Sequence, residues 1–259
     1  MSFKITPHIK ELRFLQLTIF TVLYLLLSPL LGNSVIFKIL TQLFFINSLI
    51  VSLSASAKQV RLHGLLWSLW VAAVLFYLLA QSGYASELHL WWLGLEIGSV
   101  ALLLLCCVVA TFSFIFQSQR IHLDTIFAAV MAYLLIAMIF AQIYALLVLG
   151  EPASFNFPSG PVMDSDSIFR SDLVYFSLVT IATLGYGDIV PQLGLTKMLA
   201  VVEAVMGQFY VAVLVAWLVG TFISQSLREG RQDRKRKPIS DGGQRENDES
   251  IILKKIPTG

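Results

Sequence analysis

The sequence predicts an all-α membrane protein with six transmembrane helices. Of its 259 residues, 57% are hydrophobic and 13% are charged, whereas about a quarter of the residues in soluble domains carry a charge. A membrane helix needs about 20 mostly apolar residues. Six runs of that kind follow one another along the chain, at residues 14–32, 35–55, 64–82, 89–116, 125–149 and 196–224.

The first four runs define an N-terminal membrane domain, residues 1–117. The first run is longer than the core of a secretory signal and is not followed by a small-residue cleavage site, so we expect it to be retained. Within the fourth run, Leu88 to Gln117 contains no lysine or arginine. A voltage sensor needs several arginines in one helix, because each charge crossing the field supplies only about 2.3 kcal/mol per 100 mV. We therefore expect no intrinsic voltage sensing of that type.

The basic residues predict the orientation, because cytoplasmic loops are rich in lysine and arginine. They fall before the first run and after the second, fourth and sixth runs: Lys4, Lys10, Arg13, Lys58, Arg61, Arg120 and Arg228 to Lys237. The loops on the opposite side carry the acidic residues Glu87, Glu151, Asp164, Asp166 and Asp172. Both termini are thus predicted to be cytoplasmic. A net charge of +2 is too small to indicate a nucleic-acid partner.

A short segment between the fifth and sixth runs, Thr180 to Asp188 (TIATLGYGD), carries the functional signal. Gly185 and Gly187 are two residues apart, and glycine permits backbone angles that a side chain disfavours. Such angles at alternate residues let successive carbonyls point toward one axis, where a ring of carbonyls can replace the water shell of a potassium ion. The segment resembles the selectivity filter of potassium channels. The resemblance implies that K+ is held by the backbone carbonyls of Thr183, Leu184, Gly185, Tyr186 and Gly187.

The resemblance extends over Thr125 to Leu227, after a cytoplasmic link at residues 118–124. It implies a homotetramer in the plasma membrane, with the filter mouth outside, the Thr183 hydroxyl as an additional ligand and no cofactor besides the permeant ion. The implied parts are an outer helix 125–149, a turret 150–169, a re-entrant pore helix 171–182, the filter 183–188 and an inner helix 196–224. Ser171 or Ser167 can cap the pore helix, whose negative dipole end would favour a cation in the cavity.

The segment departs from the family pattern at two places. Leu184 stands where valine or isoleucine is usual, which puts filter packing and inactivation in doubt. Tyr175 and Phe176 replace a pair of tryptophans, and Tyr175 is at a position that in some members bonds the filter aspartate, here Asp188. We expect Tyr175, Asp188 and Thr180 to support the filter; the alternative for Tyr175 is an interfacial anchor.

Two residues of the sixth run are candidates for a role in gating. Gly207 lies where the family often has a hinge, but close packing beside Ala204 and the outer helix explains a mid-helix glycine equally well. Glu203 is one turn earlier, and a carboxylate at that depth must be protonated or bonded, which we expect behind the pore helix. A structural role for Glu203 is favoured over proton sensing. In the N-terminal domain, Lys38 and Glu96 are expected to snorkel or to pair.

The chain end, residues 228–259, is predicted to be a disordered cytoplasmic tail. Its basic cluster, Arg228 to Lys237, either contacts anionic lipid or only fixes the orientation. The alternatives to a conducting channel are a subunit of a potassium transporter and a non-conducting channel subunit. No arrangement of catalytic residues indicates an enzyme.

Overall fold

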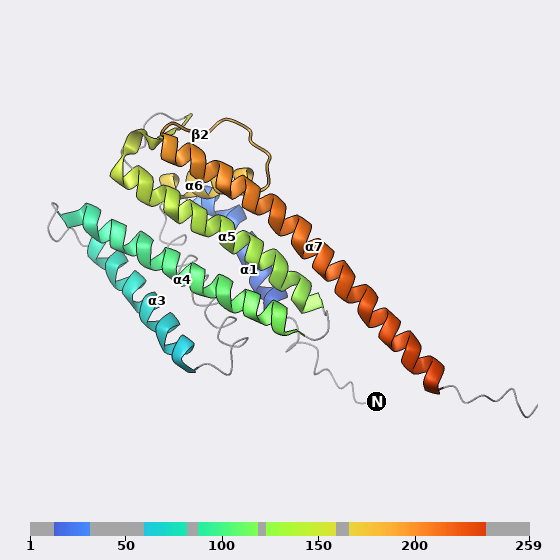
Figure 1. Ribbon diagram of the computed structural model, residues 1–259. Coiled ribbons are helices and arrows are strands. Elements are labelled where there is room, and N and C mark those ends of the chain that lie inside the picture. The colour runs from blue at the N-terminus through green and yellow to red at the C-terminus, as the bar shows by residue number, and fades with distance from the viewer. Residues whose placement is uncertain (1–12, 32–59, 82–87, 119–122, 159–165, 237–259) are drawn as a thin grey trace, which may run out of the picture. The chain divides into compact units, whose positions relative to one another are not determined.

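The computed structural model describes residues 13–31, 60–81, 88–118, 123–158 and 166–236 (Figure 1). These residues form helices joined by short segments: α1 (Arg13–Leu31), α3 (Val60–Gln81), α4 (His89–Gln117), α5 (Leu123–Gly150), a 3-10 turn η3 (Pro152–Ser154), β1 (Phe155–Asn156), α6 (Asp166–Ile181), β2 (Val190–Pro191) and α7 (Gly194–Arg236). The predicted second run, 35–55, lies outside the described residues.

Three of the described helices are long and apolar enough to cross a membrane, in the segments Leu90–Gln117, Leu123–Gly150 and Gly194–Thr221. They correspond to the predicted fourth, fifth and sixth runs, while α1 and α3 correspond to the first and third. The protein is thus mostly helical in the part that the structure describes. The number of six spans stays a prediction.

Contacts between helix ends give the directions of the helices. α4 packs between α3 and α5, and α5 also contacts α1 and α6 (Figure 1). The Phe14 N–H at the start of α1 donates to Asp124 at the start of α5, at 2.8 Å, so α1 and α5 run in the same direction. Ser118 after α4 bonds Thr125 in α5, so these two helices are antiparallel. Such alternation suits neighbouring spans joined by short links.

The chain between α5 and α7 enters and leaves at the same end of α5. Down one side runs α6, and its last residue, Ile181, accepts a hydrogen bond at 2.9 Å from the Tyr133 hydroxyl of α5. Tyr133 lies about 15 Å from the N-terminal end of α5, which is about 42 Å long. The chain then returns to β2, which pairs antiparallel with β1 directly after α5, Phe155 opposite Pro191. Residues 182–189 therefore form a re-entrant segment held between α6 and the small sheet.

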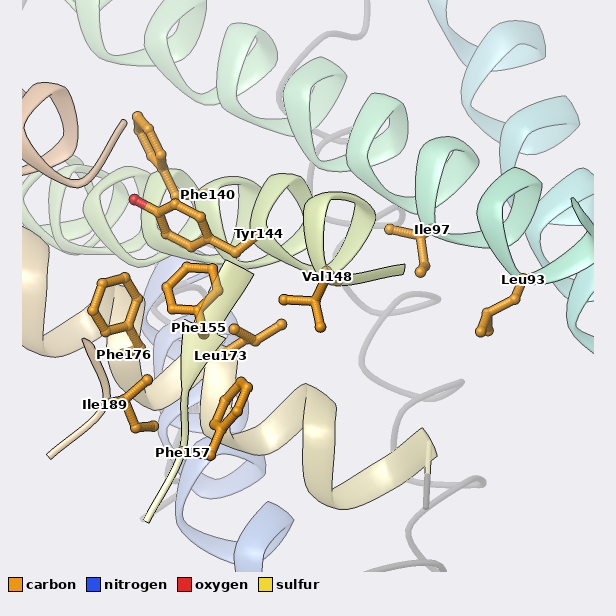
Figure 2. Close-up of a cluster of buried hydrophobic side chains, with 11 residues drawn as sticks. Leu93, Ile97, Phe140, Tyr144, Val148, Phe155, Phe157, Leu173, Phe176 and Ile189 are labelled. Atoms are coloured by element: carbon orange, nitrogen blue, oxygen red, sulfur yellow. The ribbon is translucent and has the colours of Figure 1, made fainter. Parts of the chain in front are cut away.

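An aromatic cluster fastens this segment to α5 (Figure 2). The rings of Tyr144, Phe155 and Phe176 meet edge to face, with centroids 5.1 to 5.4 Å apart. Leu173 and Ile189 belong to the same buried cluster. Edge-to-face aromatic pairs add about 0.5–1.5 kcal/mol each beyond their buried area. The cluster thus joins α5, β1, α6 and the return strand at one point.

Two predicted boundaries were wrong. α6 begins at Asp166 rather than at residue 171, because an acidic residue in the first turn is favoured by the helix dipole; the turret is correspondingly shorter. α7 continues to Arg236, so residues 228–236 are helical rather than disordered. A helix already formed adds one residue at low cost, and arginine, lysine and glutamine are good helix formers. The described residues fall into two compact units that divide between Val215 and Ala216, within α7.

Candidate functional site

The segment after α6 has left-handed backbone angles at every second residue. φ is +57° at Thr183, +56° at Gly185 and +77° at Gly187, whereas Leu184 and Tyr186 have no positive φ. In a strand whose residues all have φ of one sign, successive carbonyls point to opposite sides. Alternating signs remove that reversal, so successive carbonyls are brought toward one side. The sequence pattern predicted left-handed angles at Gly185 and Gly187 but not at Thr183.

Thr183 ends the pore helix as well as starting this alternation. Its N–H donates to the Thr180 carbonyl at 2.9 Å, and the Leu184 N–H donates to the Val179 carbonyl at 2.9 Å. This pair of bonds is a Schellman motif, in which the left-handed position is usually glycine. A β-branched residue there stores strain of about 1–3 kcal/mol, of the kind that gathers at functional sites. The Thr183 hydroxyl also accepts a hydrogen bond from Gln208 Nε2 of α7 at 3.1 Å, a contact that no sequence pattern indicated.

Tyr175 and Asp188 make the hydrogen bond that the sequence predicted. The Tyr175 hydroxyl donates to Asp188 Oδ2 at 2.7 Å, and the Ile189 N–H donates to Asp188 Oδ1 at 3.0 Å. The bond from Tyr175 lowers the pKa of the Asp188 carboxyl from its ordinary value. The bond between the two side chains links α6 to the last part of the re-entrant segment. Thr180 supports the same segment through its carbonyl, which accepts the Thr183 N–H.

Gly207 lies against the end of the pore helix. A Cβ at this position would come within 2.1 Å of the Ile181 carbonyl oxygen, the same atom that accepts the Tyr133 hydroxyl. The three atoms nearest to such a Cβ all belong to Ile181, so the closest approach is to the end of α6, while packing beside the outer helix stays a prediction. α7 runs unbroken through Gly207. A hinge role for Gly207 stays a prediction.

Glu203 is bonded behind the pore helix, as predicted. It is fully buried, and its Oε2 accepts a hydrogen bond from the Tyr144 hydroxyl of α5 at 2.6 Å. Its Oε1 contacts the Ser177 hydroxyl of α6. Glu96 of α4 is also buried, while Lys38, its predicted partner, lies outside the described residues.

The side chains of Leu184 and Tyr186 lie largely uncovered by the part of the chain that the structure describes. Leu184 is 58% exposed and Tyr186 is 67% exposed. The described residues of the same chain thus leave most of the surface of both side chains open. In the described part of the chain, there is also no cluster of three or more histidine, cysteine, aspartate or glutamate side chains that would hold a metal ion.

Comparison with known proteins places this geometry in a family. Residues 132–224 match a family model described as "Ion channel", which covers most of α5, all of α6, the segment with alternating left-handed residues, and α7 into its second half. The chain is 32% identical to Protein LctB of Bacillus caldotenax over 121 residues, which is 46% of this chain and 89% of that protein. The chain belongs to the ion channel family. This ion channel is also 29% identical to Protein LctB of Geobacillus stearothermophilus over 119 residues, covering 46% of the chain and 83% of that protein.

No solved structure matches this channel. Membership of an ion channel family supports a pore rather than an enzyme, and the apolar helices agree with a membrane protein. The family match begins after α1, α3 and α4. The pore module is therefore the part of the chain that the comparisons define.

Proposed function

We propose that this channel conducts potassium passively and selectively through a filter formed by Thr183 to Gly187. The observation that carries the proposal is the left-handed backbone at every second residue, Thr183, Gly185 and Gly187. A potassium ion enters low dielectric only if its water shell is replaced, and closely spaced carbonyls do this in potassium-selective pores. The Thr183 hydroxyl would add a ligand at the inner end.

Exposure of the filter supports assembly from several copies. One strand cannot surround an ion, and Leu184 and Tyr186 are largely exposed in a single chain. The half of α7 next to the filter also presents exposed apolar side chains, including Met198, Val205 and Phe209. Four copies about a common axis would bury these surfaces and enclose the ion with four strands. We therefore propose a homotetramer, with each chain lending one strand.

The pore helix adds an electrostatic contribution. α6 ends at Ile181, directly before the filter. The aligned peptide dipoles of a helix are equivalent to roughly half a negative charge at its C-terminal end, so four such ends around an axis would favour a cation below the filter. This supports a cavity that holds potassium before it enters the filter.

The charges of the loops support an orientation in the plasma membrane. We propose that both termini are cytoplasmic and that Asp188 faces the outside, because basic residues concentrate at the other side. The basic segment Arg228 to Lys237 would then meet the cytoplasmic leaflet, where each basic residue near anionic lipid adds about 1 kcal/mol of attraction. The helical backbone of α7 through Arg236 gives that segment a regular spacing.

Ion flux from liposomes tests the proposal. Purified protein is reconstituted with a potassium gradient, and potassium and sodium fluxes are compared. Gly185→Ala should abolish most potassium flux, because a left-handed backbone costs an L-residue about 1–2 kcal/mol in every copy. Gly194→Ala is the matched control, since Gly194 has no positive φ and a Cβ there meets no atom within 4 Å. Equal sodium and potassium fluxes, or a protein that conducts as a monomer, would contradict the proposal.

A further inference from the structure

Glu203 belongs to a buried cluster of hydroxyl and carbonyl groups that no step of conduction uses. Glu203 of α7, Tyr144 of α5 and Ser177 of α6 each have 0% exposure. Tyr144 lies 2.6 Å from Glu203 Oε2, and the Ser177 oxygen is in hydrogen-bonding contact with Glu203 Oε1. The same Ser177 oxygen lies 2.6 Å from the Ala137 carbonyl oxygen of α5. Three oxygen-to-oxygen contacts thus join three helices.

These three contacts need three protons. Each hydroxyl carries one proton, and a carbonyl oxygen only accepts. The Tyr144 proton serves the contact with Oε2. The single Ser177 proton can serve either the Ala137 carbonyl or Glu203, and since the carbonyl has no proton to give, Ser177 must donate to it. The contact between Ser177 and Oε1 then requires a proton on Glu203 itself.

A carboxylate would leave this cluster one proton short. Either the Ala137 carbonyl or Oε1 would face the Ser177 lone pairs without a hydrogen between them. Among the described residues, no basic side chain interacts with Glu203, and the other titratable group that faces it is Tyr133 of α5. An unpaired charge at membrane depth is costly, so the surroundings favour the neutral acid as well.

The neutral acid acts on the filter through the pore helix. Glu203 Oε2 accepts from Tyr144 of α5, its Oε1 contacts Ser177 of α6, and one turn later Gly207 meets the last residue of α6. In the neutral acid the Oε1 proton would be donated to Ser177. We propose that Glu203 is kept as a carboxylic acid whose proton ties the pore helix to α7, which makes it a positioning residue for the filter. The effect on the filter rests on the proposed function, whereas the protonation state does not.

Infrared spectroscopy of the reconstituted channel at neutral pH tests the protonation directly. The C=O stretching band of a protonated carboxylic acid should be present in the wild type and lose one component in Glu203→Gln. Glu96→Gln, which alters the other buried glutamate of the described chain, should leave that component in place. Loss of carboxylate absorption alone in Glu203→Gln would overturn the proposal. This readout is independent of ion selectivity, so it stands even if the channel proves unselective.

A second variant leaves Glu203 intact, in case Glu203→Gln fails to assemble. Tyr144→Phe removes the donor to Oε2, so the band should shift to higher frequency; an unshifted band would overturn the proposal. For the filter, Glu203→Gln retains one donor and one acceptor and should keep potassium flux near the wild-type level. Glu203→Ala leaves the hydroxyl groups without their partner and should lower flux about tenfold. Equal losses in both variants would refute the positioning role.

Discussion

Substituting Gly207 with alanine tests whether α7 and the pore helix meet through their main chains. The new Cβ would lie 2.1 Å from the Ile181 carbonyl oxygen, 2.8 Å from Ile181 Cγ1 and 3.0 Å from the carbonyl carbon. Non-bonded carbon atoms pack best at about 3.5–4.0 Å. The nearest contact therefore needs a movement of about 1 Å or more, and a main-chain atom moves only with its helix.

Two effects of the substitution oppose each other. Alanine is favoured over glycine inside a helix by about 1 kcal/mol. Overpacking costs about 1–3 kcal/mol, and a value at the upper end is expected because the obstructing oxygen also accepts the Tyr133 hydroxyl. We expect a net loss of about 1–2 kcal/mol in stability. Thermal melting of the purified variant in detergent measures this loss, and flux measurements show whether the filter is disturbed.

A glycine in the same helix supplies the control. A Cβ at Gly220 meets no atom within 4 Å, so Gly220→Ala should melt at or above the wild-type temperature. Combining Ile181→Ala with Gly207→Ala removes Cγ1 but leaves the carbonyl oxygen, so the double variant should recover little stability. If Gly207→Ala is as stable as the wild type and alters only gating, the hinge interpretation holds and the packing argument is wrong.

Three further predictions concern the filter itself. Tyr175→Phe removes the donor to Asp188, so conduction should decay faster in sustained flux; unchanged kinetics would argue against a supporting role. That bond lowers the pKa of Asp188 in the folded protein. The Asp188 carboxylate therefore stabilises the filter fully at pH values above the pKa of an unfolded aspartate, and this stabilisation is lost as the pH falls through the lower pKa of the folded state. External acidification should thus impair the wild type at a more acidic pH than Tyr175→Phe. Thr183→Gly and Thr183→Ala both lose the hydroxyl and should conduct poorly. Only glycine adopts the φ of +57° at this position without strain, so thermal melting should show Thr183→Gly to be about 1–2 kcal/mol more stable than Thr183→Ala. Equal melting temperatures of the two variants would exclude strain at this position.

Several features were predictable because they depend on local spacing and composition. The apolar runs that became α4, α5 and α7 are a matter of length and hydropathy alone. Gly185 and Gly187 adopt the left-handed angles expected of them. The bond between Tyr175 and Asp188 was also expected, but from the resemblance to potassium channels, some of which carry such a bond, rather than from local spacing.

The predicted start of α6 and the predicted end of α7 differ from the structure, because helix propensity, cooperativity and charge all act on a helix end. The segment after Leu227 has the composition of a disordered tail, yet α7 continues to Arg236. Composition describes an isolated segment, whereas these residues extend a helix that has already paid for its nucleation. The start of α6 at Asp166 has a different origin, since an acidic residue in the first turn interacts favourably with the helix dipole.

The sequence by itself thus determined a membrane protein, a re-entrant segment and a pair of glycines at the spacing of a carbonyl ring. Only the tertiary structure decided that Thr183 adopts the third left-handed position, that Gly207 meets Ile181, and that Glu203 joins Tyr144 and Ser177. The physical reason is the range of the interactions. Hydropathy and glycine spacing act between neighbours in the chain, whereas the partners of Gly207 and Glu203 come from helices brought together by packing.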